Sequence, residues 1–287
     1  GMAITKILEH TQDITLALWD VDASRVPGMQ PLEHVVRDAD IVFLCVSSWA
    51  LRTASESVLP FISSDTIIIS PTKGIEEGTL TTSDEILEDV FKGKGIISLM
   101  HGPMLAPEIT QGLPAFAVLA VQDKNAYTQV QELFSGTLLQ LEYSHDLHGV
   151  AVAGVLKNIY SIGLGMADAM LLGSNFRGWF VRVAIQEMES IITALGGDDR
   201  TAVTGAGLGD LIATGFSPHS RNCKVGHEIV QSGECITVSE GASSLPQMIQ
   251  LLESKNIQAP LCRGISDIVS GNRSAQDIDK IVRSCLL

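Results

Sequence analysis

The sequence is short of positive charge. It has 19 Lys and Arg residues against 33 Asp and Glu residues, which gives a formal net charge of −14. Such a chain repels nucleic-acid phosphates and anionic lipid surfaces, so neither nucleic acid nor a charged membrane is expected as a partner. Any anion that binds here must instead meet a small local group of basic side chains.

Cysteine is also scarce. The 5 cysteines are scattered along the chain, and no two of them form a CxxC pair. They stand at Cys45, Cys223, Cys235, Cys262 and Cys285. An odd, scattered set of this kind is typical of reduced thiols in a cytoplasmic protein, rather than of a disulfide framework or a zinc site. The chain opens without a basic segment followed by an apolar run, so we expect no signal peptide.

Long hydrophobic runs are absent apart from one stretch, residues 150–172. That stretch carries Lys157, Asn158 and Asp168. Charged and polar groups at this density are costly in lipid. We therefore predict a buried helix here and no membrane span.

With 287 residues and 45% apolar content, the chain is able to bury two cores. Its first half alternates strand-like with helix-like segments, and the segment 40–48 is apolar on both faces. This pattern predicts an α/β, Rossmann-like, doubly wound parallel sheet. The predicted strands are residues 14–20, 40–48, 66–74, 95–103, 115–121 and 139–143, and the predicted helices are residues 2–10, 31–39, 80–91 and 126–135.

The pattern changes after residue 144, where long helical segments follow one another and no strand is predicted. Gly196 and Gly197 stop one of these segments, as glycines often do at a helix C-terminus. We therefore expect a dinucleotide-binding domain over residues 1–144, and an all-helical domain with substrate-binding and catalytic residues over residues 145–287.

The glycine fingerprint of dinucleotide-binding folds, GxGxxG after a first strand, is missing. The chain begins at Gly1 and reaches the acidic LWDVD about twenty residues later. If Gly1 is the last glycine of a fingerprint, Asp20 or Asp22 is correctly spaced to bind the adenosine ribose, and these carboxylates favour NAD over NADP. Alternatively, Gly1 is a cloning remnant and Met2 a start codon.

Two lysines are candidates for chemistry. Lys157 lies in the apolar helical pattern VAVAGVLKNIYSIG, where burial would lower its pKa and make it a general base near neutral pH. A side chain that extends to solvent is the alternative. Lys73 directly follows a predicted strand and either faces a ligand at the carboxyl edge of the sheet or lies on a surface loop. Gly102 occupies another strand end.

The stretch GLGDLIATGFSPHSRN contains further polar candidates. Its Asp210 is able to pair with Lys157 and position it. Ser220, Arg221 and Asn222 precede a helical pattern, and a helix N-terminus with an arginine fork favours a phosphate. The alternative is an ordinary N-cap at Ser220 and a solvated Arg221.

The histidines give weaker signals. His145 and His148 have a spacing that some metal sites use, but no third ligand is near, so a junction between a loop and a helix is favoured. His101 and His219 flank the candidate site and serve there as hydrogen-bonding groups.

Together these motifs resemble the NAD(P)-dependent glycerol-3-phosphate dehydrogenase family. The combination of the Lys157-Asn158 pair with GLGDL and SRN is specific to it. The matching segments are PTKGIEEGTL, HGPMLAPE, GVAVAGVLKNIYSIGLGMADAMLLGSN, GAGLGDLIATGFSPHSRN and SEGASS.

The resemblance implies reversible hydride transfer between NAD or NADP and dihydroxyacetone phosphate, which yields sn-glycerol 3-phosphate, in a cytoplasmic homodimer without a metal. It implies that Lys157 is the proton donor and acceptor, with Lys73 and Asp210 completing the catalytic set. The implied substrate-binding residues are Lys73, Gly102, Asn158, Asp210, Thr214, Ser220, Arg221 and Asn222. The implied cofactor-binding residues are Gly1, Asp20, Lys73, Ala106, Arg221 and Glu240.

The sequence also departs from the family. The first strand and early glycines are absent, and the family's Ser-Gly-Pro-Ser or Thr motif reads His101, Gly102, Pro103, Met104. After GSN, the family's arginine is displaced to Arg182. Two alternatives therefore stand beside the dehydrogenase. One is a catalytically silent protein that binds glycerol phosphate, and the other is a related reductase of another small ketone.

Overall fold

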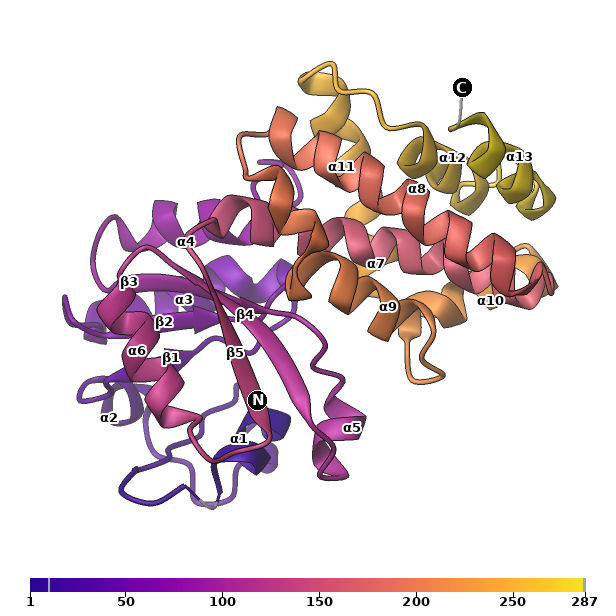
Figure 1. Ribbon diagram of the computed structural model, residues 1–287. Coiled ribbons are helices and arrows are strands. Elements are labelled where there is room, and N and C mark those ends of the chain that lie inside the picture. Colours follow the sequence, from indigo (N-terminus) through magenta and orange to yellow (C-terminus); the bar gives the residue numbers. More distant parts are fainter. Residues whose placement is uncertain (10, 286–287) are drawn as a thin grey trace.

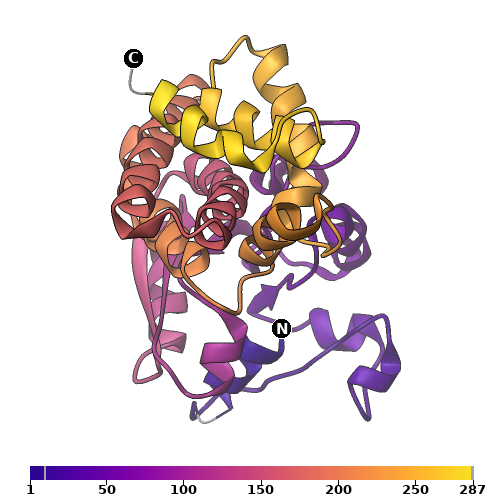
Figure 2. The same cartoon turned by 90° about the vertical axis from the view of Figure 1, so that its right-hand side faces the viewer.

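The computed structural model describes residues 1–9 and 11–285 and consists of a sheet-bearing half followed by a helical half (Figure 1). The first half contains α1 Met2–Leu8, α2 Leu32–Val36, β1 Ile41–Phe43, α3 Leu51–Val58, β2 Ile67–Ser70, α4 Ser83–Phe91, β3 Ile96–His101, α5 Ala106–Thr110, β4 Ala115–Val121, α6 Lys124–Leu133 and β5 Leu139–Ser144. The second half contains α7 Leu147–Ala169, α8 Gly173–Ala194, α9 Asp210–Gly215, α10 Arg221–Ser232, α11 Glu240–Ser254, α12 Pro260–Val269 and α13 Ile278–Ser284. The two chain ends lie on different halves (Figure 2).

The sheet has the strand order β1-β2-β3-β4-β5, and helices on both faces explain why its central strands are mainly apolar. On β2, Ile68 packs with α3, α4 and the start of α7, whereas Ile67 and Ile69 pack on the opposite face with α1, α5 and α6. The few polar side chains of β2 and β3, Ser70, Ser98 and His101, are buried as well. The predicted α/β doubly wound sheet is confirmed.

One strand pair departs from the predicted parallel arrangement. All neighbours are parallel except β3 and β4, which are antiparallel, with Ser98 opposite Val121. A parallel connection needs a long crossover, usually through a full helix. The link between β3 and β4 contains only the short α5, so the chain returns in the opposite direction.

The predicted strand at residues 14–20 is wrong, because this segment has no regular structure. Strands form only where a neighbour supplies hydrogen-bonding groups. β1 is an edge strand, and within residues 1–9 and 11–285 no strand pairs with its outer side. The predicted helix at residues 2–10 ends at Leu8. His10 and residues 286–287 fall outside the described residues.

α7 is the centre of the helical half (Figure 1). It is buried from Gly149 to Ala167, and α8, α9, α10 and α11 pack around it. In the described part of the chain it is the one helix long and apolar enough to cross a membrane, but it is buried inside the fold. The predicted buried helix is confirmed, since packing on all sides explains an apolar surface all round.

The start of α7 also belongs to the core of the first half. Leu147, Val150 and Ala151 pack with Val118 and Ala120 of β4. β5 ends at Ser144 and α7 begins at Leu147, and the division into 1–144 and 145–287 stays our proposal. One continuous helix therefore passes from the sheet into the helical half.

A histidine at the start of α7 binds α4. His148 Nδ1 lies 2.8 Å from Asp84 Oδ2, and the pair lines a cavity of about 650 Å³ together with Glu85, Glu88 and Asp146. Hydrogen bonding to Asp84 raises the pKa of His148. Burial alone would raise the pKa of Asp84, but His148 holds it below its ordinary value. In the described part of the chain no cluster of His, Cys, Asp and Glu is able to hold a metal ion.

The substitution His148→Gln is expected to lower the free energy of unfolding by roughly 1–2 kcal/mol, because a charge-assisted hydrogen bond is lost. The contribution of His148 is complete below its ordinary pKa of 6.5 and disappears as the pH rises through its raised folded-state pKa. The contribution of Asp84 is complete above 3.8 and disappears as the pH falls through its lowered folded-state pKa. Urea unfolding should therefore show the widest gap between wild type and variant from about pH 4 to 6.5. A gap that does not vary with pH would contradict the pairing.

Candidate active site

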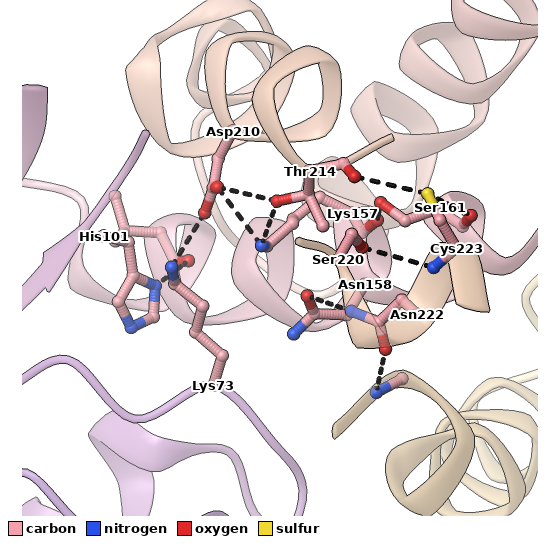
Figure 3. A network of polar contacts seen from close by, with 12 residues as sticks. Lys73, His101, Lys157, Asn158, Ser161, Asp210, Thr214, Ser220, Asn222 and Cys223 are labelled. Atoms are coloured by element: carbon pink, nitrogen blue, oxygen red, sulfur yellow. Dashed lines mark hydrogen bonds and ion pairs between the residues drawn. The ribbon is translucent and has the colours of Figure 1, made fainter. Parts of the chain in front are cut away.

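Two lysines share one carboxylate at the seam between the halves (Figure 3). Lys73 Nζ donates to Asp210 Oδ2 at 2.7 Å, and Lys157 Nζ lies 3.2 Å from Asp210 Oδ1. Lys157 Nζ also donates to Thr214 Oγ1 at 2.8 Å, and that hydroxyl donates to Asp210 Oδ1 at 3.1 Å. The structure thus brings together four of the residues that the sequence predicts for the site.

Three different elements supply these side chains. Lys73 follows β2 at the carboxyl edge of the sheet, Lys157 lies in the middle of α7, and Asp210 begins α9. A π-helical turn, Gly205–Gly209, precedes Asp210. Within it, a Cβ at Gly207 would lie 2.2 Å from the carbonyl oxygen of Ala202, so only glycine fits. The first glycine of GLGDL, Gly207, therefore allows a close backbone approach just before Asp210.

Burial controls the protonation of the group. Lys157 has only 5% of its surface exposed, so its side chain does not extend to solvent. Burial and, to a lesser extent, the charge of Lys73 lower the pKa of Lys157, whereas Asp210 raises it, and the resulting pKa is about 8. Burial also acts to raise the pKa of Asp210, but the two ammonium groups outweigh it and hold that pKa below its usual range. Lys157 is therefore able to gain and lose a proton near neutral pH.

A second polar chain lies beside the lysines (Figure 3). Asn222 Nδ2 donates to Asn158 Oδ1 at 2.8 Å, and Asn222 Oδ1 accepts from the backbone nitrogen of Gly241 at 3.0 Å. These bonds join α7, α10 and α11. Ser220 is the N-cap of α10 and accepts from the backbone nitrogen of Cys223. The arrangement fixes the amide of Asn158 next to Lys157.

Arg221 differs from its neighbours in the SRN motif. Asn222 and Ser220 are buried, whereas Arg221 is exposed at the first position of α10. Its guanidinium makes no hydrogen bond or ion pair with the rest of residues 1–9 and 11–285. An unpaired guanidinium at a helix N-terminus is a ready donor for an anion.

The remaining candidates do not touch the two lysines. Gly1 is the N-cap of α1, Ala106 begins α5, and these two short helices pack on each other. Asp20 Oδ1 accepts from the backbone nitrogen of Asp22 at 2.9 Å. Glu240 Oε2 accepts from Ser48 Oγ at 2.6 Å and so joins the first half to α11.

Gly102 has a structural role, because the backbone conformation at this position requires a glycine. Its φ of +152° disfavours other residues, and a Cβ would lie 2.7 Å from the carbonyl oxygen of Phe116. The turn after β3 therefore requires glycine in order to pass β4.

Sequence reasoning missed two contributors, Ser48 and Cys223, and the partners of a third, His101. Ser48 was one of two serines at a strand end, and nothing local indicated its bond to Glu240. Cys223 points its thiol at the carbonyl oxygens of Thr214 and Gly215, and burial raises its pKa to about 11. His101 was identified as a flanking group, but its two backbone contacts, with Thr72 and Val150, depend on the tertiary structure.

Two sequence profiles of one family match most of the chain. The profile for the NAD-dependent glycerol-3-phosphate dehydrogenase N-terminus matches residues 3–127. The profile for the NAD-dependent glycerol-3-phosphate dehydrogenase C-terminus matches residues 146–280.

Individual relatives agree with the profiles. A glycerol-3-phosphate dehydrogenase [NAD(P)+] of Fusobacterium nucleatum is 31% identical over 254 residues, which cover 86% of this chain and 76% of that protein. One from Pseudomonas aeruginosa is 33% identical over 271 residues, or 90% of this chain and 78% of the relative. The crystal structure of glycerol-3-phosphate dehydrogenase from Coxiella burnetii superposes with a TM-score of 0.80 at 26% identity and covers 89% of this chain and 79% of its own.

The substitution Asp210→Asn tests the shared carboxylate. It leaves the buried ammonium group of Lys157 and the partly buried one of Lys73 without a counter-charge, so we expect the pKa of Lys157 to fall below about 8 and the free energy of unfolding to drop by roughly 3–5 kcal/mol. Denaturant unfolding and a ¹⁵N NMR titration of the lysine Nζ atoms measure the two effects. Asp168→Asn is the control, since Asp168 lies in an exposed ion pair with Arg177 and should cost less than about 1 kcal/mol. Equal costs for the two variants would show that Asp210 does not hold the lysines.

Proposed function

The chain belongs to the NAD-dependent glycerol-3-phosphate dehydrogenase family, and on this premise we propose that it interconverts dihydroxyacetone phosphate and sn-glycerol 3-phosphate with Lys157 as acid and base. The observation that carries the proposal is the pair of lysines, Lys157 buried and Lys73 partly buried, on one buried carboxylate. Reduction of a ketone places a hydride on carbon and leaves negative charge on oxygen. A positioned ammonium group stabilises that charge and then supplies the proton.

Each member of the cluster has a separate task in the proposed mechanism. Lys157 donates its proton to the carbonyl oxygen in reduction and takes it back from the hydroxyl in oxidation. A pKa of about 8 leaves both protonation states accessible near neutral pH. Asp210 and Thr214 hold the Lys157 ammonium in place. Lys73 contributes a second positive charge beside the developing oxyanion.

The residues present fit a nicotinamide cofactor. Gly1 at the start of α1 lies against Cys45 after β1, and Lys73 follows β2, so all three meet at the carboxyl edge of the sheet. A Cβ at Gly74 would overlap Ser48, so this glycine lets Ser48 reach Glu240 at the same edge. When bound, the nicotinamide supplies or accepts the hydride. The residues proposed to hold it are Gly1, Asp20, Lys73, Ala106, Arg221 and Glu240, and Asp20 favours NAD over NADP.

The start of α10 is proposed to bind the substrate phosphate. Arg221 supplies a free guanidinium there, and α10 contributes the partial positive charge of its N-terminus. Asn158 and Asn222 lie between this point and Lys157, close enough to bind the substrate hydroxyl groups. This arrangement selects a small phosphorylated ketone.

A reductase of a different small ketone is the second candidate, because His101 and Met104 replace the family's hydroxyl residues. His101 is wholly buried, and burial lowers its pKa to about 3, so the ring is neutral and adds no charge to the site. Comparing turnover of dihydroxyacetone phosphate with turnover of unphosphorylated dihydroxyacetone and of a 2-keto acid separates the two candidates.

A cytoplasmic location and a homodimer complete the proposal. All 5 cysteines, each of them among the described residues, are free thiols, which fits a reducing compartment. Leu171, Trp179 and Phe216 are exposed apolar side chains of the helical half and are the proposed contribution to a subunit interface.

Lys157→Met should lower kcat for ketone reduction by about 10²–10⁴-fold while it keeps the volume of the side chain. In the wild type, kcat/KM for reduction should fall as the pH rises above about 8, because the reaction needs the protonated amine. The rate of glycerol 3-phosphate oxidation should rise through the same pH, because it needs the neutral amine. Loss of reduced-nicotinamide absorbance measures both. Lys255→Met, at an exposed position, is the matched control, and comparable turnover of the two variants would refute the role of Lys157.

Arg221→Ala should raise KM for dihydroxyacetone phosphate by about 10–100-fold, since a charged hydrogen bond to phosphate is lost. At saturating cofactor, where any loss of cofactor binding by Arg221 does not limit the rate, turnover of unphosphorylated dihydroxyacetone should not change, because this substrate has no phosphate to bind. Arg273→Ala serves as the control, since Arg273 is a surface residue paired with Asp267. A variant that loses activity equally towards both ketones would argue against phosphate binding by Arg221.

A further inference from the structure

His101, the last residue of β3, bridges the two chain segments that carry the lysines. Its Nδ1 lies 3.0 Å from the carbonyl oxygen of Val150 in α7. Its Nε2 lies 3.0 Å from the carbonyl oxygen of Thr72, the residue before Lys73. The side chain is wholly buried. No solvent therefore competes for either contact.

The ring serves as a spacer rather than as an acid or base. Burial, aided by the positive charge of Lys73, lowers the pKa of His101 to about 3. A neutral imidazole has one N–H, so it donates to one of the two carbonyl oxygens, and the other ring nitrogen only touches the second carbonyl oxygen. Its position is fixed by two backbone groups on different elements.

α7 makes room for this ring at Gly154. A Cβ at Gly154 would lie 2.6 Å from His101 Nδ1 and 3.1 Å from Lys73 Cγ. Gly154 stands one helical turn after Val150 and nearly one turn before Lys157. The imidazole, the stem of Lys73 and the surface of α7 beside Lys157 are therefore in mutual contact.

The other hydrogen bonds of Thr72 stay within the first half. Thr72 Oγ1 donates to the carbonyl oxygen of Val46 at 2.8 Å, and the backbone nitrogen of Thr72 donates to Ser70 Oγ at 3.2 Å. Both partners belong to the first half. His101 adds the contact that relates this loop to α7.

We propose that His101 is a positioning residue that sets the separation of the Lys73 and Lys157 ammonium groups across the seam. This inference rests on the proposed function, in which both lysines act on the substrate. Without the ring, Lys73 is free to move away from Asp210 and α7. The carboxylate of Asp210 then pairs with Lys157 alone, and the repulsion between Lys157 and Lys73 becomes weaker.

The first test is His101→Ala. We expect kcat to fall by about 10–100-fold while KM stays within about threefold, because misplaced catalytic groups affect the transition state more than substrate binding. The conservative His101→Asn, which keeps a side-chain donor, should restore part of kcat. His34→Gln, at an exposed histidine of α2, is the matched control.

A direct readout is the ¹⁵N NMR titration of Lys157 Nζ, which needs no turnover. The charged or titratable groups that act on Lys157 are Asp210 of α9, Lys73 after β2 and Cys223 of α10. If Lys73 moves away in His101→Ala, the Lys157 titration should shift upward by roughly 0.5–1 pH unit. A purely structural role for His101 would lower the melting temperature without this shift.

Gly154→Ala is an independent variant that keeps the histidine at position 101. Its added methyl group should push the ring and the Lys73 stem apart, and so lower kcat and move the Lys157 titration. Gly178→Ala is its control, since Gly178 lies in α8 with open space around it.

The outcomes are distinguishable. A fall in kcat together with a moved Lys157 titration, in either variant, supports the inference. An unchanged kcat, or a loss of kcat with an unmoved titration, overturns it. If the wild type turns over no dihydroxyacetone phosphate, the proposed function fails, and the titration alone decides the role of His101.

Discussion

The site depends on one buried carboxylate, that of Asp210, which pairs with two lysines from different parts of the chain. Removing charges from water is costly, and only close pairing offsets that cost. The buried Lys157 and Asp210 and the partly buried Lys73 therefore stay paired only while β2, α7 and α9 keep their relative places. The same burial that makes the arrangement costly also moves the pKa of Lys157 to about 8, where proton transfer is useful.

α7 connects this electrostatic constraint with the packing of the protein. Its first turns belong to the core of the sheet, its middle carries Lys157 and Asn158, and the other helices of the second half surround it. Every polar group on such a helix needs a partner. Thr214 of α9 accepts a hydrogen bond from Lys157, and Asn222 of α10 donates one to Asn158. Partners from the surrounding helices thus let a core helix carry the proposed chemistry.

Most of the fold was predictable because its signals are local or periodic. The apolar strands of the sheet, the glycines that follow α8 and the serine N-cap at Ser220 each follow from nearby residues. The failures were long-range. Residues 14–20 have the composition of a strand but no neighbour to pair with, and β4 runs antiparallel to β3 because its connection is short. Strand formation and direction depend on partners, which a segment does not contain.

The candidate site divides in the same way. The sequence alone indicated Lys73, Lys157, Asp210 and the SRN motif as candidates and revealed the resemblance to a family. Charged residues within apolar segments cost free energy unless they have partners or a function, so they stand out in the sequence. The tertiary structure alone decided that Asp210 meets both lysines, that Glu240 bonds to Ser48, and that His101 touches the carbonyls of Thr72 and Val150. These contacts join residues far apart in the chain. Their geometry is set by how whole helices and strands pack on one another, and this packing cannot be deduced from any single stretch of the sequence.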